Sequence, residues 1–300
     1  MFGSIPHLML AFQVVKTYNN AIMQTPIKKN LANATKVFVI LAALLVYSGW
    51  MLTTPPGFLS KADSIGYAVC HRIPERSFHI GNYQLPLCAR CSGMYLGAML
   101  GLAFQVLIAK RRSGMPPWRV IIPLALLVIA FGVDGSNSYL YLIKETYSGV
   151  TINIPNLYIP NNVLRLLTGS GMGLVISVAM FPAFNQTVWK DQDPRPALTG
   201  FKSLSLLVMI TLLIDLLVLT QSAFVLYPLA ILSAAGVLVL LSMIYGILWL
   251  MLFHQENKYE RLSQVWVALL AGLTIGILQI AMVDALRFWL TGTWTGFPLK

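Results

Sequence analysis

Runs of apolar residues recur along the chain, and each run ends at charged residues, at proline or at a short polar stretch. A helix needs about 17–25 mostly apolar residues to cross a bilayer. The pattern predicts seven membrane-spanning helices, over residues 37–53, 92–108, 120–139, 163–184, 203–220, 227–253 and 262–290. Six or eight helices also fit, because only a few residues join the fifth run to the sixth. We therefore expect an all-α, polytopic membrane bundle.

The polar segments between these runs predict the domain organisation. Residues 1–36 carry four lysines and form an N-terminal segment, in which residues 8–15 are expected to make an interfacial helix. Residues 37–300 form a single helical membrane domain. Its longest polar loop, with the start of the second span, covers residues 54–93, and residues 187–198 are the most polar of the later loops. No separate soluble domain is expected.

Composition and charge agree with a membrane protein. Hydrophobic residues make up 57% of the chain and charged residues 10%, whereas soluble domains carry about 25% charged residues. The net charge of +11 lies in the loops and not in a basic patch interleaved with aromatic residues, so we expect the lipid bilayer as a partner and no nucleic acid.

The distribution of Lys and Arg predicts the orientation of the spans. With the N-terminus inside, 13 of the 21 basic residues lie on the inner side. The remaining eight are Lys61, Arg72, Arg76, Arg90, Lys144, Arg165, Arg287 and Lys300. Because basic residues concentrate in cytoplasmic loops, we expect a multi-pass protein of the plasma membrane. Its N-terminus is then inside, and the 54–93 loop is extracytoplasmic.

All three cysteines of the chain fall in residues 70–93, together with two of the four histidines. Cys88 and Cys91 form a C-x-x-C step followed by Ser92 and Gly93, which is typical of a metal knuckle. In such a knuckle a glycine accepts the unusual backbone angle of the turn. The ligands that we expect are Cys70, Cys88 and Cys91 with His71, or His79 in its place. This donor set predicts zinc.

Five charged residues fall within the predicted spans: Asp134, Arg165, Asp215, Asp284 and Arg287. Given the alternating directions of the spans, all five lie toward the outer side. A charge near the bilayer centre costs about 2.5–3.5 kcal/mol on insertion scales, so such residues pair or line a wet cavity. They predict one polar site beneath the cysteine loop. The alternative is that Asp284 with Arg287, and Asp134 with Arg165, only neutralise each other.

Glycines predict close helix packing below the loop. Gly93, Gly97 and Gly101 are four residues apart and share one face of the second span. Gly169 and Gly173 repeat this spacing in the fourth span. We expect another helix to approach each of these faces closely.

Two stretches resemble the signature of a prokaryotic membrane-protein family, domain of unknown function 2085. They are CHRIPERSF at residues 70–78 and QLPLCARCSG at residues 84–93. Asp134-Gly135 is similar to a later pattern of that family. Asn162, Arg165, Thr168 and Gly169 are similar to its Asn-x-x-Arg-x-x-Thr-Gly pattern. The resemblance covers about residues 60–180 and implies a membrane location and a shared site, but no reaction.

The first functional hypothesis is an outward-facing zinc protein, as an enzyme on an anionic small molecule or a lipid-linked substrate. Asp134 is then the candidate base, and Arg165 completes the catalytic pair. Guanidinium groups bind phosphate and carboxylate in a bidentate manner. The expected substrate-binding residues are Arg72, Arg76, Arg90, Arg287, Asp284 and Asp215.

Two other hypotheses remain open. Cys88 and Cys91 are also typical of a redox dithiol that exchanges with a partner or a quinone, with Cys70 as the resolving thiol. A transporter with a structural metal is the third hypothesis, although the charges cluster at one end of the spans. The sequence does not predict the oligomeric state.

Overall fold

The computed structural model describes residues 26–146 and 154–294, and the chain divides into two compact units, Met1–Leu45 and Val46–Lys300. The first unit is described from Pro26 onward and consists of the N-terminal part of helix α2 (Pro26–Thr53). Leu41, Leu44 and Leu45 of this unit are exposed. The interfacial helix expected at residues 8–15 lies outside the described residues.

The second unit contains the rest of α2 and the elements that follow it. Its helices are α3 (Phe58–Val69), α4 (Ala89–Ala109), α5 (Trp118–Thr146), α6 (Asn162–Val188), α7 (Phe201–Leu219), α8 (Ala223–Leu252) and α9 (Trp266–Thr291). Two short 3-10 turns are η1 (Pro74–Arg76) and η2 (Leu262–Gln264). Strands β1 (His79–Ile80) and β2 (Tyr83–Gln84) form an antiparallel hairpin. Strands β3 (Arg112–Gly114) and β4 (Asp193–Pro196) pair in parallel.

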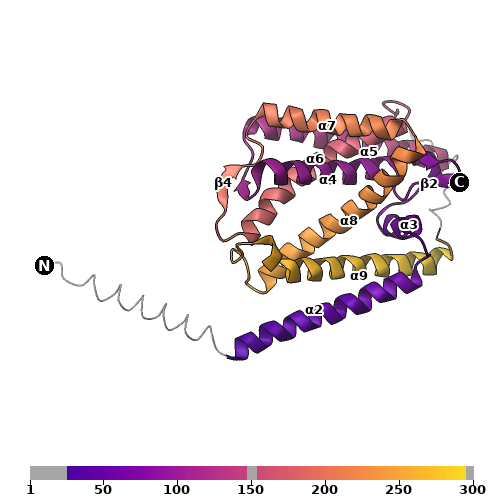
Figure 1. Cartoon of the computed structure of the whole chain (residues 1–300). Coiled ribbons are helices and arrows are strands. Elements are labelled where there is room, and N and C mark those ends of the chain that lie inside the picture. The colour runs from indigo at the N-terminus through magenta and orange to yellow at the C-terminus, as the bar shows by residue number, and fades with distance from the viewer. Residues whose placement is uncertain (1–25, 147–153, 295–300) are drawn as a thin grey trace. The chain divides into compact units, whose positions relative to one another are not determined.

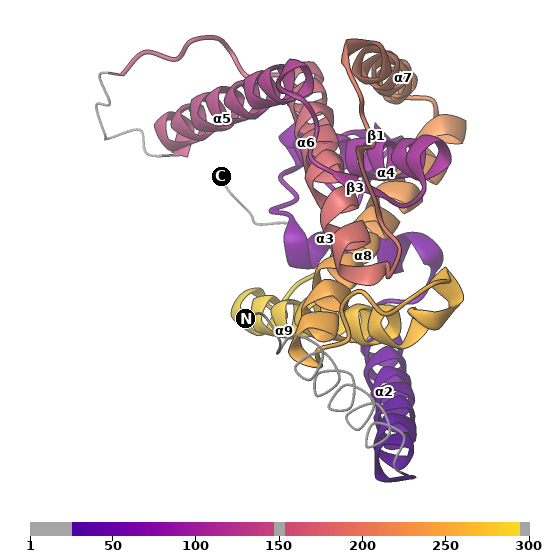
Figure 2. The same cartoon turned by 90° about the vertical axis from the view of Figure 1, so that its left-hand side faces the viewer.

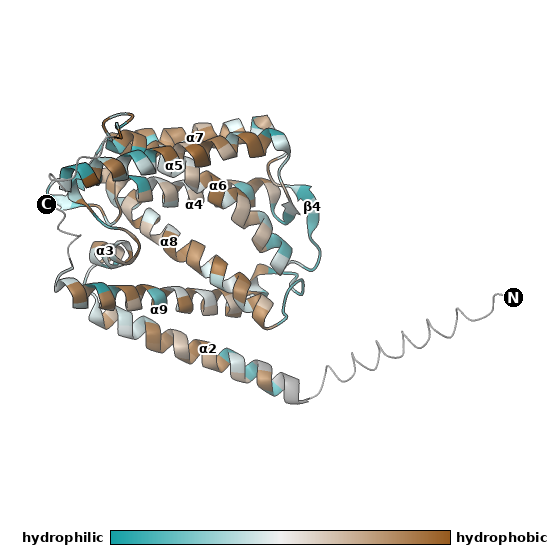
Figure 3. Cartoon of the chain, turned by 180° about the vertical axis from the view of Figure 1, so that it is seen from behind, coloured by the Kyte–Doolittle hydropathy of each residue, from teal (hydrophilic) through white to brown (hydrophobic). Residues whose placement is uncertain are grey.

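Seven helices in residues 26–146 and 154–294 are long and apolar enough to cross a membrane: α2 from Asn33 onward, α4, α5, α6, α7, α8 and α9. This confirms the seven predicted spans and the all-α bundle. Their outer faces carry exposed large apolar side chains such as Leu107, Leu126 and Leu216, which a bilayer would cover. Figure 3 shows α5 and α7 mostly brown (hydrophobic), with teal residues near the ends of the bundle. The protein is therefore a multi-pass membrane protein.

The apolar pattern did not predict the short elements, of which helix α3 and strand β4 are examples. Helix α3 lies within the stretch expected to be a loop, starts after Gly57 at φ 105° and buries Ala62 and Ile65. Strand β4 lies in the polar stretch 187–198. Both elements are too short to be seen as spans, and their partners are distant in the sequence, so tertiary contacts decide them.

Helices α4 and α6 pack with their backbones in contact (Figures 1 and 2), as the glycine spacing predicted. A Cβ atom added at Gly97 would lie 2.4 Å from the carbonyl oxygen of Ser170. A Cβ atom at Gly173 would lie 2.1 Å from the carbonyl oxygen of Met94. Any side chain there would separate the two helices, so these glycines fix the distance between the elements that carry much of the site.

A hydrophobic cluster supports the cysteine segment from below. Trp50, Ile65, Leu87, Val237 and Ile277 are buried in the same cluster as two of the cysteines. These residues come from α2, α3, the loop before α4, α8 and α9. The sulfurs therefore rest on packed side chains from several helices.

Candidate metal centre

The structure brings the sulfur atoms of Cys70, Cys88 and Cys91 within 4.8 Å of one another. Cys70 and Cys88 are buried, Cys91 is half-buried, and none of the three is in a disulfide. Zinc–sulfur bonds of about 2.3 Å in a tetrahedron place sulfurs about 3.8 Å apart. The observed spacing therefore fits three thiolates on one ion after a small contraction.

Cys70 is held by the end of α3 and by its own neighbours. It caps α3, where its N–H donates to the carbonyl of Gly66 at 2.8 Å. The chain then turns sharply, since Arg72 has φ 50°. This turn lets the backbone N–H of Arg72 donate to Cys70 Sγ at 3.5 Å, and the N–H of Cys88 donates to the same sulfur at 3.3 Å. Two backbone donors on one sulfur favour its thiolate form.

The C-x-x-C step forms the N-terminus of α4. Cys88 is the N-cap residue and Cys91 lies in the first helical turn. The positive end of the helix dipole favours thiolates at this position. The expectation that Gly93 accepts an unusual backbone angle is wrong, because Gly93 is helical. A Cβ atom there would instead lie 2.4 Å from the carbonyl oxygen of Leu166 on α6.

The thiols of Cys70 and Cys88 differ in acidity. Hydrogen bonds from Cys88 and then from Cys91 hold the pKa of Cys70 well below its usual range, although burial opposes them. The hydrogen bond to Cys70 raises the pKa of Cys88 to about 12. The thiols of Cys88 and Cys91 thus share their protons with Cys70, and a metal cation bound to the three sulfurs would take the place of those protons.

The two histidines of the motif lie in different places. His71 Nδ1 lies 3.5 Å from Cys70 Sγ, and its ring lines the same pocket as the three cysteines. His79 belongs to β1, where it pairs with Gln84, and it is not a lining residue of that pocket. Of the two expected alternatives, His71 is thus the one that stands beside the sulfurs.

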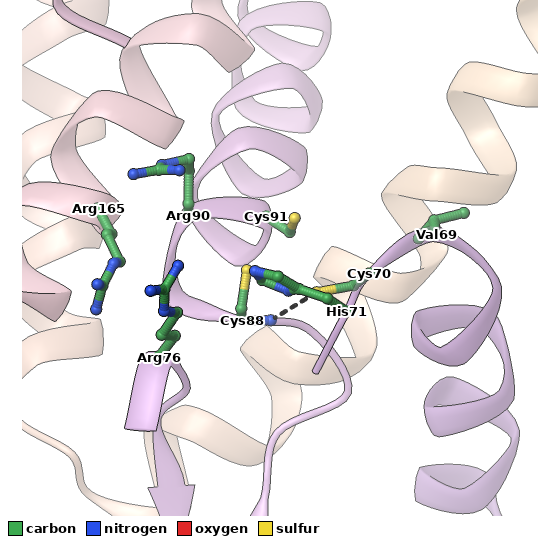
Figure 4. A pocket seen from close by; sticks show the side chains of 8 residues that line it. All are labelled: Val69, Cys70, His71, Arg76, Cys88, Arg90, Cys91 and Arg165. Carbon is green, nitrogen blue, oxygen red and sulfur yellow. Dashed lines mark hydrogen bonds between the residues drawn. The ribbon is translucent and has the colours of Figure 1, made fainter. Parts of the chain in front are cut away.

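Three arginines share the pocket with the sulfurs. The pocket has a volume of about 250 Å³, and its polar lining residues are Cys70, Cys88, Cys91, His71, Arg76, Arg90 and Arg165. Figure 4 shows the three arginines on one side and the cysteines with His71 on the other. The approach of so many cations makes the pocket electropositive. Burial, followed by repulsion from Arg90, lowers the pKa of Arg76.

Arg90 is the arginine that has an acidic partner. Its guanidinium forms an ion pair with Asp134, with Nε 3.1 Å from Oδ2. Asp134 is 1% exposed and also accepts from Tyr158 at 2.7 Å and from Thr168 at 3.1 Å. Asp134 therefore lies behind Arg90 and is not itself a lining residue. The hypothesis that Asp134 forms an ion pair with Arg165 is wrong, because its ion-pair partner among the described residues is Arg90.

Arg76 and Arg165 use uncharged partners. Arg76 Nη2 donates to the carbonyl of Ser138 at 3.2 Å, and Arg165 Nη1 donates to Asn162 Oδ1 at 2.9 Å. Arg165 is 6% exposed, and its buried Nε has no hydrogen-bond partner. In the part of the chain that the structure describes, neither arginine forms an ion pair with a carboxylate.

The Asn-x-x-Arg-x-x-Thr-Gly pattern at the start of α6 has a structural explanation at each position. The Nδ2 group of Asn162 donates to the carbonyl of Glu75 at 3.2 Å, which ties α6 to the segment that carries Arg76. Thr168 donates to Asp134, and Gly169 lies against the backbone of Arg90. This eight-residue pattern, about two turns of α6, thus helps to position all three arginines.

Two residues of this network, Ser138 and Tyr158, were not expected from the sequence. Ser138 accepts from Arg90 through its hydroxyl at 3.0 Å and from Arg76 through its carbonyl. It follows Asp134 by four residues, so a shared helix face was a usable signal. Tyr158 lies in the irregular segment before α6, where no periodicity indicated a contact with Asp134.

Besides Asp134, four of the expected site residues do not line the pocket. Arg72 pairs with Asp63 at 2.8 Å, and Asp215 accepts from Ser170 at 2.7 Å. Asp284 accepts from Trp50 Nε1 at 3.4 Å. Arg287 donates to the carbonyls of Cys70 at 2.7 Å and of His71 at 3.4 Å, and to that of Tyr67. Arg287 therefore holds the cysteine segment from behind.

The comparisons with known proteins concern the same part of the chain. A family model described as "Predicted membrane protein (DUF2085)" matches residues 70–179. An uncharacterized protein of Methanocaldococcus jannaschii is 30% identical over 124 residues, which cover 41% of this chain and 67% of that protein. An uncharacterized protein of Methanothermobacter thermautotrophicus is 33% identical over 110 residues, 36% of this chain and 82% of that protein. No solved structure matches. All polar residues that line the pocket fall within the matched segment.

Proposed function

This chain belongs to the DUF2085 family of predicted membrane proteins, and we propose that its cysteine cluster binds zinc next to a site for an anionic group of a lipid-linked substrate. The observation that carries this proposal is one pocket lined by three convergent thiols and three guanidinium groups. Cysteine sulfur is a preferred zinc ligand, and catalytic zinc sites use three protein ligands with a fourth position open.

The donor set suits such a site. Cys70, Cys88 and Cys91 supply three sulfurs, and His71 is the nearest candidate for the fourth position. Zinc held by the three sulfurs alone would keep its fourth position open and supply a Lewis acid that activates water, whereas His71 in that position would close the site and make the zinc structural. The chain's own contribution is to fix the sulfurs through the backbone donors on Cys70 and through Arg287 behind it.

The arginines supply the binding site for the anion. Arg76 and Arg165 carry buried positive charges that have uncharged partners, and a buried charge without a counterion is costly. A phosphate or carboxylate between them would restore the balance and accept several hydrogen bonds. Asp134 acts through Arg90 as a positioning residue, because it holds that guanidinium against the pocket.

A second pocket favours a lipid-linked substrate over a soluble one. It has a volume of about 340 Å³ and shares Val69, Cys70 and His71 with the first. The rest of its lining includes the apolar Leu286 and Leu290 of α9. A substrate with its anionic group at the arginines would find an apolar surface beside the same three residues.

We place this site on the extracytoplasmic side of the plasma membrane. The support is the excess of Lys and Arg in the loops of the opposite end, which the positive-inside rule assigns to the cytoplasm. A substrate reaching the site is then a lipid of the outer leaflet.

Elemental analysis of the protein purified in detergent tests the metal. We expect about one zinc ion per chain, and much weaker binding in Cys88→Ser and in Cys70→Ser, since each variant removes one of the three thiolate ligands. His71→Ala should weaken zinc binding, whereas His79→Ala, the matched control, should keep it. Protein without bound metal, or equal effects of the two histidine variants, would contradict the assignment.

The second candidate is a thiol redox protein. The position of Cys88 and Cys91 at the N-terminus of α4 favours it, because redox-active C-x-x-C pairs occupy helix N-termini. Mass spectrometry of protein alkylated in intact cells, with and without prior reduction, distinguishes the two. Zinc binding predicts three reduced thiols in both samples after metal removal, and the redox candidate predicts a Cys88–Cys91 disulfide before reduction.

A further inference from the structure

We propose that the end of the bundle opposite the cysteines binds an anionic membrane lipid, with a hydrocarbon chain between the helices and its phosphate at Lys110 and Arg111. This site is separate from the proposed function and does not depend on it. The two basic residues follow α4, whose 21 residues span about 30 Å, so they lie about the thickness of a bilayer's hydrocarbon core from Cys88.

A large apolar cavity lies between α4, α6, α8 and α9. Its volume is about 790 Å³, within the about 300–1,000 Å³ typical of ligand pockets. Leu102, Phe181, Leu238 and Leu273, one from each helix, represent a lining that is almost wholly apolar. Figure 1 shows α8 crossing between α4 and α9 in this part of the unit. In a bilayer the natural occupant of such a cavity is a hydrocarbon chain.

The cavity has a cationic end. Lys110 and Arg111 both belong to its lining, and Arg111 lies over the ring of Trp189, 4.8 Å from the centroid. Arg111 also donates to the carbonyl of Glu260. Lys110 forms no ion pair within residues 26–146 and 154–294. A hydrocarbon cavity that ends at two cations is complementary to an anionic lipid and not to a zwitterionic or neutral one.

The basic segment is held in place. Asn185, which also lines the cavity, donates through Nδ2 to the carbonyls of Lys110 at 3.0 Å and of Arg112 at 2.8 Å. Its Oδ1 accepts from Trp189 Nε1 at 2.8 Å. One buried side chain therefore fixes both the backbone that carries the cations and the ring on which Arg111 stacks.

Neighbouring acidic groups are matched by other cations. Glu260 pairs with Lys190 at 3.0 Å, and Asp193 pairs with Arg195 at 2.8 Å. Each of these carboxylates already has a basic partner, and Asp193 also lies 3.8 Å from Arg112, so they compete little for Lys110. Lys110 has no ion-pair partner in the described part of the chain, and a lipid phosphate would supply its counterion.

Native mass spectrometry of the detergent-purified protein with added phosphatidylglycerol or phosphatidylcholine tests the proposal. We expect phosphatidylglycerol to bind more tightly. The variant Lys110→Gln/Arg111→Gln should lose about thirtyfold of that affinity, about fivefold for each cation near the membrane surface. Lys258→Gln is the matched control, because Lys258 is an exposed cation of the α8–α9 connection that does not line the cavity.

Filling the cavity tests the hydrocarbon part. Leu238→Trp on α8 should weaken binding of both lipids, and Ala103→Leu on α4 provides a second, smaller filling variant if the first fails to fold. Equal affinity for the two lipids, or phosphatidylglycerol binding that neither set of variants changes, would overturn the proposal.

Discussion

At the scale of single residues, the site depends on how buried charges are satisfied. Asp134 meets Arg90, Tyr158 and Thr168, so its charge is balanced and hydrogen-bonded within the protein. Among the described residues, Arg165 has an amide partner on Nη1 and no partner on Nε. One carboxylate among three arginines leaves a positive pocket, and this imbalance is the basis for expecting an anionic ligand.

Removal of the Asp134 charge tests this balance. Asp134→Asn leaves Arg90 partly buried without its counterion, and the loss of one partner of a buried ion pair costs about 3 kcal/mol or more. Tyr158→Phe removes only one hydrogen bond of the same carboxylate and should cost about 1 kcal/mol. Thermal unfolding in detergent, followed by tryptophan fluorescence, measures the loss of stability in each of the two variants. Equal losses in the two variants would show that the ion pair does not stabilise the fold.

At the scale of elements, the site depends on the contact between α4 and α6 and on the support that α9 gives to the end of α3. Gly169 allows the backbone of Arg90 to lie against α6. Arg287 reaches from α9 to the carbonyls around Cys70. Neither Gly169 nor Arg287 lines the cysteine pocket. Gly169 positions the backbone of Arg90, and Arg287 positions the backbone of Cys70 and His71.

A glycine substitution measures the first of these contacts. A Cβ atom at Gly169 would lie 2.1 Å from the carbonyl oxygen of Arg90, so Gly169→Ala must separate α4 from α6 and should destabilise by about 1–3 kcal/mol. Gly132→Ala on α5 is the control, since its new Cβ atom meets nothing within 4 Å. The same unfolding assay applies. A Gly169→Ala protein as stable as Gly132→Ala would disprove the tight contact.

Substitution of Arg287 measures the contribution of its contact with the carbonyls around Cys70. Residues that orient metal ligands from behind typically contribute about 10–100-fold to metal affinity. Arg287→Met should therefore weaken zinc binding by about 10–100-fold while the three sulfurs remain, as measured by competition with a chelator. Arg72→Met is the control, because Arg72 pairs with Asp63 away from the pocket. Unchanged zinc affinity in Arg287→Met would exclude this supporting role.

At the scale of the whole molecule, seven spans place the two ends of the bundle on opposite sides of a membrane. The cysteine pocket lies at the N-terminal end of α4, and the apolar cavity lined by Lys110 and Arg111 lies at its C-terminal end. The excess of Lys and Arg at the second end is the reason for expecting that end on the cytoplasmic side.

Cysteine labelling tests this orientation. Gln221, between α7 and α8, and Lys258, between α8 and α9, are both exposed and suit labelling. Ser113, in the connection after α4, is buried and is therefore a poor labelling position. We expect a membrane-impermeant maleimide to label Gln221→Cys in intact cells and Lys258→Cys only after permeabilisation. The parent protein, with its native thiols largely buried, is the blank. The reverse pattern would invert the orientation and place the cysteine pocket in the cytoplasm.

The sequence by itself determined the membrane class, the seven spans and the glycine faces, because apolar runs and small residues at intervals of four report local physics. It also identified Cys70, Cys88 and Cys91 as one group of residues. Only the tertiary structure decided that α3 is a helix, that Asp134 pairs with Arg90, and that Arg287 supports the cysteine segment from α9. These partners are separated by tens to hundreds of residues, and a buried charge takes whichever partner the packing brings near. No local pattern carries that information.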